Sequence, residues 1–265
     1  MSEPTKSHGR LSIQASLKPR DLMAERGADP GAWTAEVITL FPETFPGILG
    51  ASLTGKALDE GKWRLKTVDL RVFGEGRHRN VDDTPAGGGA GMVLRADVMA
   101  KAIRQCGADR RDRAKWPLIY LSPRGRPFDQ SRATELARGE GATLICGRFE
   151  GLDERVIEAF DIEEISLGDF VLSGGEIAAQ AVLDATVRLI PGVLGNAAST
   201  VEESFSEGLL EHPQYTRPAV WEGRPIPSVL TSGDHGAVDR WRRETSEALT
   251  RTRRPDLWNR LKPKT

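Results

Sequence analysis

Three glycine-containing loops, each after a strand-like run, have the composition of a ligand site built from backbone atoms. They read YLSPRG (120–125), CGRFEG (146–151) and LGDFVLSGGE (167–176). Glycine lets the backbone turn sharply or approach a ligand closely, and loops after parallel strands meet at one edge of the sheet. The loops carry small, aromatic and apolar residues but no lysine cluster, which favours a flat heterocycle over a triphosphate. The simpler alternative is three tight turns.

Two common nucleotide-binding motifs do not fit these glycines. A phosphate-binding loop ends in Gly-Lys-Ser/Thr, whereas Gly174 and Gly175 precede Glu176, whose carboxylate would repel a phosphate. The dinucleotide motif Gly-x-Gly-x-x-Gly fails at GGGAGM, where Met92 replaces the last glycine. The four histidines and two cysteines are scattered without zinc spacing, so we expect no structural metal.

Strands and helices alternate along residues 33–195, which predicts an α/β domain with a largely parallel sheet. Residues 1–32 are polar and predict a flexible extension. We expect a linker at 196–206 and a small helical domain at 207–265. The expected strands are 33–41, 63–73, 117–122, 142–147 and 162–166, and the expected helices are 45–59, 95–106, 128–139, 152–160, 176–189 and 235–261.

The charge distribution is uneven, although the net charge is −1. Residues 139–211 contain 15 acidic and 3 basic side chains, whereas residues 217–265 contain 11 basic and 6 acidic ones. A basic C-terminal part indicates a nucleic-acid surface, with a simple solvated surface as the alternative. No run has the length and apolarity of a membrane span, and the N-terminus has no secretory pattern. We therefore expect a cytoplasmic protein that does not enter a membrane.

Longer motifs make the sequence similar to a known family. They occur in the family's order and read FPETF, RHRNVDDTPAGGGAGM, YLSPRG, CGRFEG, DERV, GDFVLSGGE, IPGVLG, ESFSEGLLEHPQYTRP and LTSGDH. Over about residues 34–261 the chain resembles the bacterial tRNA (guanine-N1-)-methyltransferases of the TrmD family. This resemblance implies a SPOUT-type α/β fold with a deep trefoil knot. It also implies methyl transfer from S-adenosyl-L-methionine to N1 of the guanine just 3′ of the anticodon, position 37 of tRNA.

The resemblance assigns the three glycine loops to the cofactor. The adenine and ribose would lie against loops whose backbone groups read the adenine edge. The cofactor-binding residues implied in this way are Tyr120, Leu121, Ser122, Gly147, Glu150, Leu167, Gly168, Asp169, Phe170, Val171, Leu172, Gly174 and Gly175.

Methylation of N1 requires a base, because neutral guanine carries a proton there, and a cation to stabilise the charge that develops on O6. The resemblance places the cation at Arg188 and the base at Glu203, where the family has aspartate. The extra methylene moves the carboxylate by about one bond length. The alternatives are that Glu203 is a solvated acid beside Glu202 and that Arg188 only pairs with Asp184.

The resemblance also implies a tRNA substrate and a homodimer whose active site is shared between the chains. The implied tRNA-contacting residues are Arg77, Arg79, Asp83, Tyr215, Arg217, Arg240, Arg242 and Arg243. The alternatives are that segment 71–80 is a mobile loop without specific contacts and that the basic C-terminal helix is an ordinary solvent-exposed helix. Glu150 and Glu203 could attract Mg²⁺ near the cofactor carboxylate, although no metal ligand set is visible in the sequence.

Two other functions are compatible with the sequence. The glutamate at position 203 is compatible with an RNA-binding protein that no longer catalyses. A knotted methyltransferase with another RNA target is the third hypothesis, but the segment HPQYTRP argues against it.

Overall fold

A five-stranded parallel sheet forms the centre of the computed structural model, which describes residues 31–194, 204–205 and 208–261. Its strands are β1 (Trp33–Thr39), β2 (Trp63–Asp69), β5 (Leu118–Pro127), β6 (Gly141–Cys146) and β7 (Glu163–Ser166), in the spatial order β2-β1-β6-β5-β7. Every pairing between neighbouring strands is parallel. The predicted α/β fold with a largely parallel sheet is therefore confirmed.

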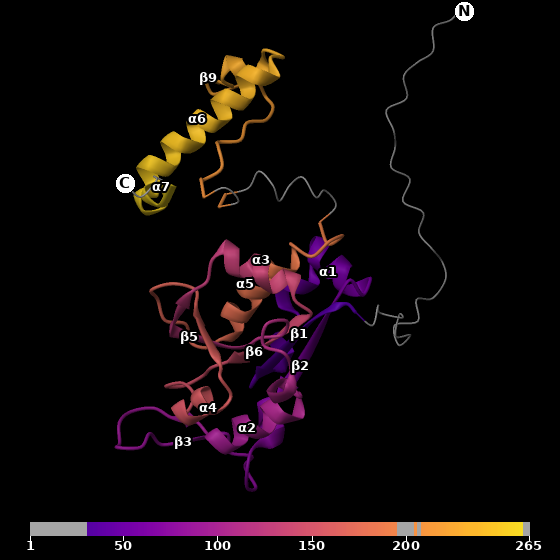
Figure 1. Cartoon of the computed structure of the whole chain (residues 1–265), viewed down its shortest axis with the longest axis vertical. Helices are drawn as coiled ribbons and strands as arrows, with labels where there is room; N and C mark the ends of the chain where they lie inside the picture. The colour runs from indigo at the N-terminus through magenta and orange to yellow at the C-terminus, as the bar shows by residue number, and fades with distance from the viewer. Residues whose placement is uncertain (1–30, 195–203, 206–207, 262–265) are drawn as a thin grey trace, which may run out of the picture.

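Helices cover both faces of this sheet (Figure 1). Helices α1 (Ser52–Asp59), α3 (Gln130–Arg138) and α5 (Glu176–Val187) pack on one face, where Trp63, Leu144 and Leu183 lie in a single apolar core. Helices α2 (Ala96–Gln105) and α4 (Glu154–Ala159) pack on the other face, around a second core. The central strands β1 and β6 are buried at every residue because helices cover both of their faces.

One carboxylate lies inside the sheet and is fully compensated. Glu36, in the middle of β1, is 5% exposed. Its oxygens accept hydrogen bonds from Arg111 Nη2 at 3.2 Å and Thr143 Oγ1 at 3.3 Å. The Arg111 guanidinium in turn lies 3.8 Å above the ring of Trp116. Because a buried charge is tolerated when it is paired, this cluster lets a polar residue occupy a fully buried strand.

Two expected elements are shorter than the sequence indicated. The helix expected at 45–59 is helical in the α sense only at Ser52–Asp59, because Pro46 and the glycines at 47 and 50 favour the 3₁₀ turn Gly47–Gly50. The strand expected at 63–73 ends at Asp69. There the Asp69 carboxylate accepts a hydrogen bond from the Arg71 N–H at 2.9 Å and caps the 3₁₀ helix Leu70–Phe73.

Strand β5 contains an interruption that bears on the site. Its first part pairs with β7 through Ile119–Leu121, and its last part pairs again through Arg126 and Pro127, with a register shift between them. Residues 122–125 therefore bulge out while both flanks of the strand stay in the sheet.

The C-terminal part is helical, as expected. It contains the short hairpin β8 (Val220–Trp221) and β9 (Arg224–Pro225), the 3₁₀ helix Ser228–Thr231, and helices α6 (His235–Arg253) and α7 (Pro255–Leu261). The Asp234 carboxylate caps α6 by accepting a hydrogen bond from the Ala237 N–H at 3.0 Å. Among the described residues, no helix is long and apolar enough to cross a membrane.

Several expectations fall outside the described residues. These are nearly the whole extension at 1–32, most of the linker at 196–206, and Glu203. The proposed domain boundaries stay predictions.

Candidate active site

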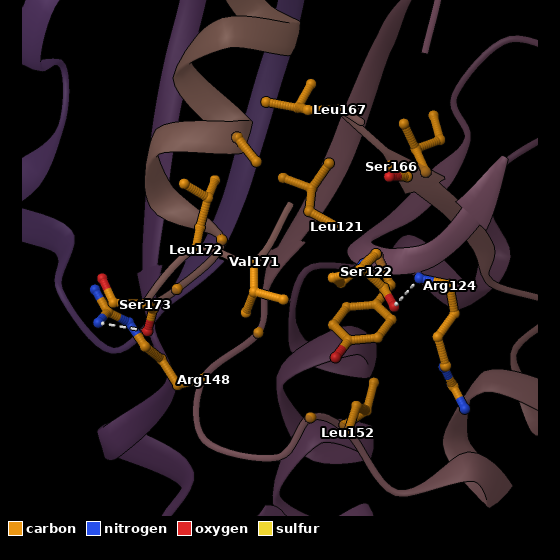
Figure 2. A pocket seen from close by; sticks show the side chains of 18 of the residues that line it. Leu121, Ser122, Arg124, Arg148, Leu152, Ser166, Leu167, Val171, Leu172 and Ser173 are labelled. Carbon is orange, nitrogen blue, oxygen red and sulfur yellow. Dashed lines mark hydrogen bonds between the residues drawn. The ribbon is translucent and has the colours of Figure 1, made fainter. Parts of the chain in front are cut away.

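The three glycine loops form the walls of one cavity of about 330 Å³. The first wall is the end and bulge of β5, the second is the loop after β6, and the third is the loop between β7 and α5. Figure 2 shows Arg148 and Arg124 on opposite sides of this cavity, with Leu121, Val171 and Leu172 between them. The site thus has an apolar middle and a cationic side chain on either side.

The predicted cofactor residues come together at this cavity, with one exception. Asp169 is exposed and does not belong to the lining. The others line the cavity: Tyr120, Leu121, Ser122, Gly147, Glu150, Leu167, Gly168, Phe170, Val171, Leu172, Gly174 and Gly175. The contact of each residue with a cofactor stays a prediction.

The structure adds lining residues that the sequence did not single out as ligand contacts. Some of them, such as Pro123, Arg124 and Phe149, stand inside the same three motifs, so the motifs themselves carried the signal. Others belong to the flanking elements and had no signal of their own: Leu152, Ile165, Ser166 and Ala178.

Polar side chains fix the first and third walls. Ser122 Oγ accepts a hydrogen bond from the Arg124 N–H at 3.2 Å, which shapes the β5 bulge (Figure 2). The Arg124 guanidinium donates to Glu154 at 2.9 Å and to Glu164 at 3.1 Å. Ser166 Oγ bonds both the N–H and the C=O of Gly168 at 3.1 Å, so the third loop leaves β7 along a fixed path.

Two titratable groups at the walls, the Tyr120 hydroxyl and the Cys146 thiol, are neutral at pH 7. Burial raises the pKa of the Tyr120 hydroxyl above its usual value. Burial, with the nearby Glu176 carboxylate as a second cause, raises the pKa of the Cys146 thiol well above its usual value. A cysteine acts as a nucleophile in its thiolate form, so Cys146 is a packing residue at neutral pH.

The third loop returns directly onto the second through Gly175. Its N–H donates to the Gly147 carbonyl at 2.9 Å. A Cβ atom at Gly175 would stand 2.7 Å from Cys146 Cα and 2.9 Å from the Gly147 nitrogen. Both are backbone atoms, so neither can move aside, and only glycine fits at this position.

The predicted tRNA-binding segment is joined to the second wall. Strands β3 (Asp82–Asp83) and β4 (Val93–Leu94) form a short antiparallel pair on either side of the glycine-rich loop. The Glu150 N–H donates to the Met92 carbonyl and the Leu94 N–H donates to the Gly151 carbonyl, each at 2.9 Å. The base of this loop is therefore held against the cavity.

The turn that carries Arg77 and Arg79 has a defined base. Glu75 and Asn80 exchange backbone hydrogen bonds of 3.1 and 2.9 Å. The Glu75 carboxylate also accepts hydrogen bonds from Arg95 and Lys101 on the side of α2. Arg77, Arg79 and Asp83 are exposed. In the C-terminal part Tyr215, Arg217, Arg240 and Arg243 are exposed and Arg242 is half-buried.

The two predicted catalytic residues do not join the cavity within the described part of the chain. Arg188 follows the last residue of α5, whereas the first turn of this helix borders the cavity. At roughly 1.5 Å per residue, the helix rises about 20 Å from Gly175 to Arg188. Glu203 lies outside the described residues. No three His, Cys, Asp or Glu side chains are grouped for a metal ion in the described residues, and the Mg²⁺ expectation at Glu150 and Glu203 stays a prediction.

Comparison with known proteins gives a clear result. The family tRNA (Guanine-1)-methyltransferase TrmD matches residues 34–260. The chain belongs to the TrmD family.

Individual relatives agree with this assignment to TrmD. A tRNA (guanine-N(1)-)-methyltransferase from Ruegeria pomeroyi is 69% identical over 230 residues, which cover 87% of this chain and 94% of the relative. Proteins of the same name from Jannaschia sp. and Brucella ovis are 67% and 60% identical, over 88% and 86% of this chain and 95% and 92% of the relatives. The resemblance seen in the motifs is confirmed over the sheet and the C-terminal helices alike.

The close backbone contact at Gly175 gives a first prediction. Gly175→Ala should weaken binding of S-adenosylmethionine by at least about tenfold, because the new Cβ would clash with the backbone of Cys146 and Gly147 and displace the cavity wall in a closely packed region. Isothermal titration calorimetry measures the affinity. The matched control is Gly236→Ala in α6, where the new Cβ meets its nearest atom at an ordinary 3.5 Å. Equal affinity of Gly175→Ala and wild type would show that the contact does not shape the site.

Proposed function

We propose that this chain transfers a methyl group from S-adenosyl-L-methionine to N1 of the guanine just 3′ of the anticodon (position 37) in tRNA. The observation that carries this proposal is the TrmD match, because it spans residues 34–260 and so includes both the cavity and the C-terminal helices. The relatives with the same span are named for methylation of tRNA at guanine N1.

The cavity suits this cofactor in size and in lining. Its volume of about 330 Å³ lies within the range of roughly 300–1,000 Å³ for small-molecule sites. Gly147, Gly174 and Gly175 have no side chains that would fill the cavity, and Leu121 and Leu172 offer apolar surface. When bound, the cofactor supplies the methyl group on its sulfonium. We also assign the deep trefoil knot of the SPOUT-type fold to this region, on the strength of family membership.

In this proposal Glu203 is the base and Arg188 is the cation. The Glu203 carboxylate would accept the proton from guanine N1 as the methyl group passes to that nitrogen, so the pyrimidine ring does not accumulate positive charge. The bond between the methyl carbon and the cofactor's sulfur breaks in the same transfer, and the sulfur leaves as a neutral thioether. Arg188 stabilises the negative charge that grows on O6. Glutamate has the same carboxylate as the family's aspartate on a side chain one methylene longer.

The distance along α5 supports an active site shared between two chains. Arg188 lies at the opposite end of α5 from the cavity of its own chain. In a homodimer its side chain would instead reach the cavity of the second copy. Exposed apolar residues on the cavity side support the same arrangement: Val171 is 85% exposed, Ile177 63%, and Ile48 69% on a 3₁₀ turn that packs against α5. A contiguous apolar patch is typical of a protein–protein surface, and these three side chains would contribute to one.

The C-terminal helices are assigned to the tRNA backbone. Arginines at 217, 240 and 243 are exposed, and phosphate contacts of this type orient a nucleic acid without reading its bases. Tyr215 packs edge-on against Trp241, with ring centres 6.1 Å apart, which holds the HPQYTRP segment on α6. With the tRNA backbone held in this way, the part of the tRNA that carries the anticodon would reach the cavity, and this would place the guanine at position 37 there.

The site of methylation is the direct test. With methyl-labelled cofactor and a tRNA that carries guanine at position 37, the label should appear at N1 of that guanine. Mass spectrometry of nuclease fragments locates it, and the same tRNA with adenine at position 37 is the control. Label at a different base would overturn the assigned specificity.

Replacement of the proposed base should slow the chemical step. Glu203→Gln should lower the single-turnover rate by about 10²–10⁴-fold, the contribution typical of a general base, while Glu203→Asp should stay active. The neighbouring Glu202→Gln is the matched control and should leave the rate unchanged. Equal rates for Glu203→Gln and wild type would remove Glu203 from the mechanism. A wild type that binds tRNA without turnover would favour the non-catalytic RNA-binding function.

Mixed dimers test whether the site is shared. At a cofactor concentration that wild type binds and Gly175→Ala does not, homodimers of Glu203→Gln and of Gly175→Ala both turn over very little, for different reasons. In a mixed dimer one shared site receives both intact parts. Randomly mixed chains should therefore recover about a quarter of the wild-type sites, given two-fold symmetry. Active-site titration on the co-refolded mixture measures the fraction. Recovery of no activity would show that each chain uses its own Glu203.

A further inference from the structure

A buried carboxylate stands behind the third wall of the cavity and has no part in the chemistry described above. Glu176 is the first residue of α5 and is 3% exposed. It does not line the cavity. Its Oε1 accepts a hydrogen bond from Thr39 Oγ1 at 2.7 Å, and its Oε2 lies 2.8 Å from Arg148 Nη2.

Arg148, the partner of this carboxylate, does line the cavity and is held from three directions. Besides the ion pair with Glu176, its Nη1 donates to the Ser173 carbonyl at 3.1 Å, as the dashed line in Figure 2 shows. Its guanidinium also lies 4.4 Å above the ring of Phe41. The side chain thereby connects the end of β1 with the second and third walls.

The third loop lies directly on this ion pair. A Cβ atom at Gly174 would stand 2.2 Å from Arg148 Nε and 2.6 Å from Glu176 Oε2. A side chain at position 174 would thus displace the ion pair beneath the loop, whether or not a ligand is bound. The loop from 168 to 175 is fixed at one end by Ser166 and at the other by Arg148 and Glu176.

The ion pair between Glu176 and Arg148 has a role other than stabilising the fold. A buried ion pair contributes little net stability compared with apolar residues of the same volume, because both charges lose their hydration. What the pair does provide is position, because the Glu176 charge holds the guanidinium 2.8 Å away although its N–H groups are not aligned for a hydrogen bond to Oε2. Held there, Arg148 donates its hydrogen bond to the Ser173 carbonyl, which belongs to the cavity wall.

We propose that Glu176 is a positioning residue for the cofactor site: through Arg148 it fixes the course of the third loop and with it the shape of the cavity. This inference rests on the proposed function, because it takes S-adenosylmethionine as the ligand of the cavity. Glu176 touches neither ligand nor reacting atoms. Its effect belongs to cofactor affinity rather than to the chemical step.

Glu176→Gln tests the role, because it removes the charge and keeps the volume. The dissociation constant for S-adenosylmethionine should rise about tenfold or more, because removing one partner of a buried ion pair leaves the Arg148 charge uncompensated and free to shift. At saturating cofactor, kcat and the KM for tRNA should stay within about threefold of wild type. Calorimetry without tRNA gives the affinity, and steady-state kinetics give the separation of KM and kcat.

A matched control separates positioning from general stability. Leu183→Ala lies on the same helix, 1% exposed and in the core. It should lower the melting temperature and leave cofactor affinity unchanged. If Glu176→Gln behaves in the same way, with lower stability and unaltered affinity, the residue has a structural role only and the proposal is wrong.

A double-mutant cycle tests the route through Arg148. If Glu176 acts through that guanidinium, Glu176→Gln should add little to the loss of affinity caused by Arg148→Met, whereas independent losses would multiply. Should Glu176→Gln fail to fold, Thr39→Val is the second variant. It removes one hydrogen bond to the carboxylate, keeps the ion pair, and should raise the dissociation constant by a smaller factor.

The outcomes also separate this inference from the proposed function. A wild-type protein that does not bind S-adenosylmethionine would refute the function. A wild type that binds it, together with a Glu176→Gln variant of equal affinity, would refute the positioning role and leave the function standing.

Discussion

The close contact between the start of α5 and the end of β6 is the constraint on which the site depends. Gly175 bonds to the Gly147 carbonyl and packs on the backbone of Cys146, which fixes where the helix begins. The first helical residue, Glu176, is thereby placed under the loop, where it meets Arg148. The loop 168–175 then has to span the distance back to β7. One backbone contact thus determines the position of the helix, the ion pair and a wall of the cavity.

Much of this arrangement was visible in the sequence, because it depends on local patterns. Alternating strands and helices predicted the parallel sheet, and three glycine motifs predicted loops that share a ligand. The failures were local as well: proline and glycine at 46, 47 and 50 shortened a helix, and the cap formed by Asp69 ended a strand early.

The role of Glu176 could not be predicted in that way. Its partners stand 137 residues away at Thr39 and 28 residues away at Arg148, a distance that no periodicity spans. From the sequence the glutamate only argued against a phosphate loop. The structure shows that the Glu176 carboxylate faces the protein interior, where it pairs with Arg148, rather than a ligand. Arg188 is a similar case, because its separation from the cavity follows from helix geometry and not from any motif.

The interrupted pairing of β5 has a consequence for the kinetics of ligand exchange. The bulge at 122–125 is held in the sheet on both flanks, so this wall cannot swing aside without breaking strand pairing. The wall formed by 168–175 is held by side-chain contacts at its ends and carries the highly exposed Val171. Of these two walls, only the loop 168–175 can move to admit or release a ligand without breaking strand pairing.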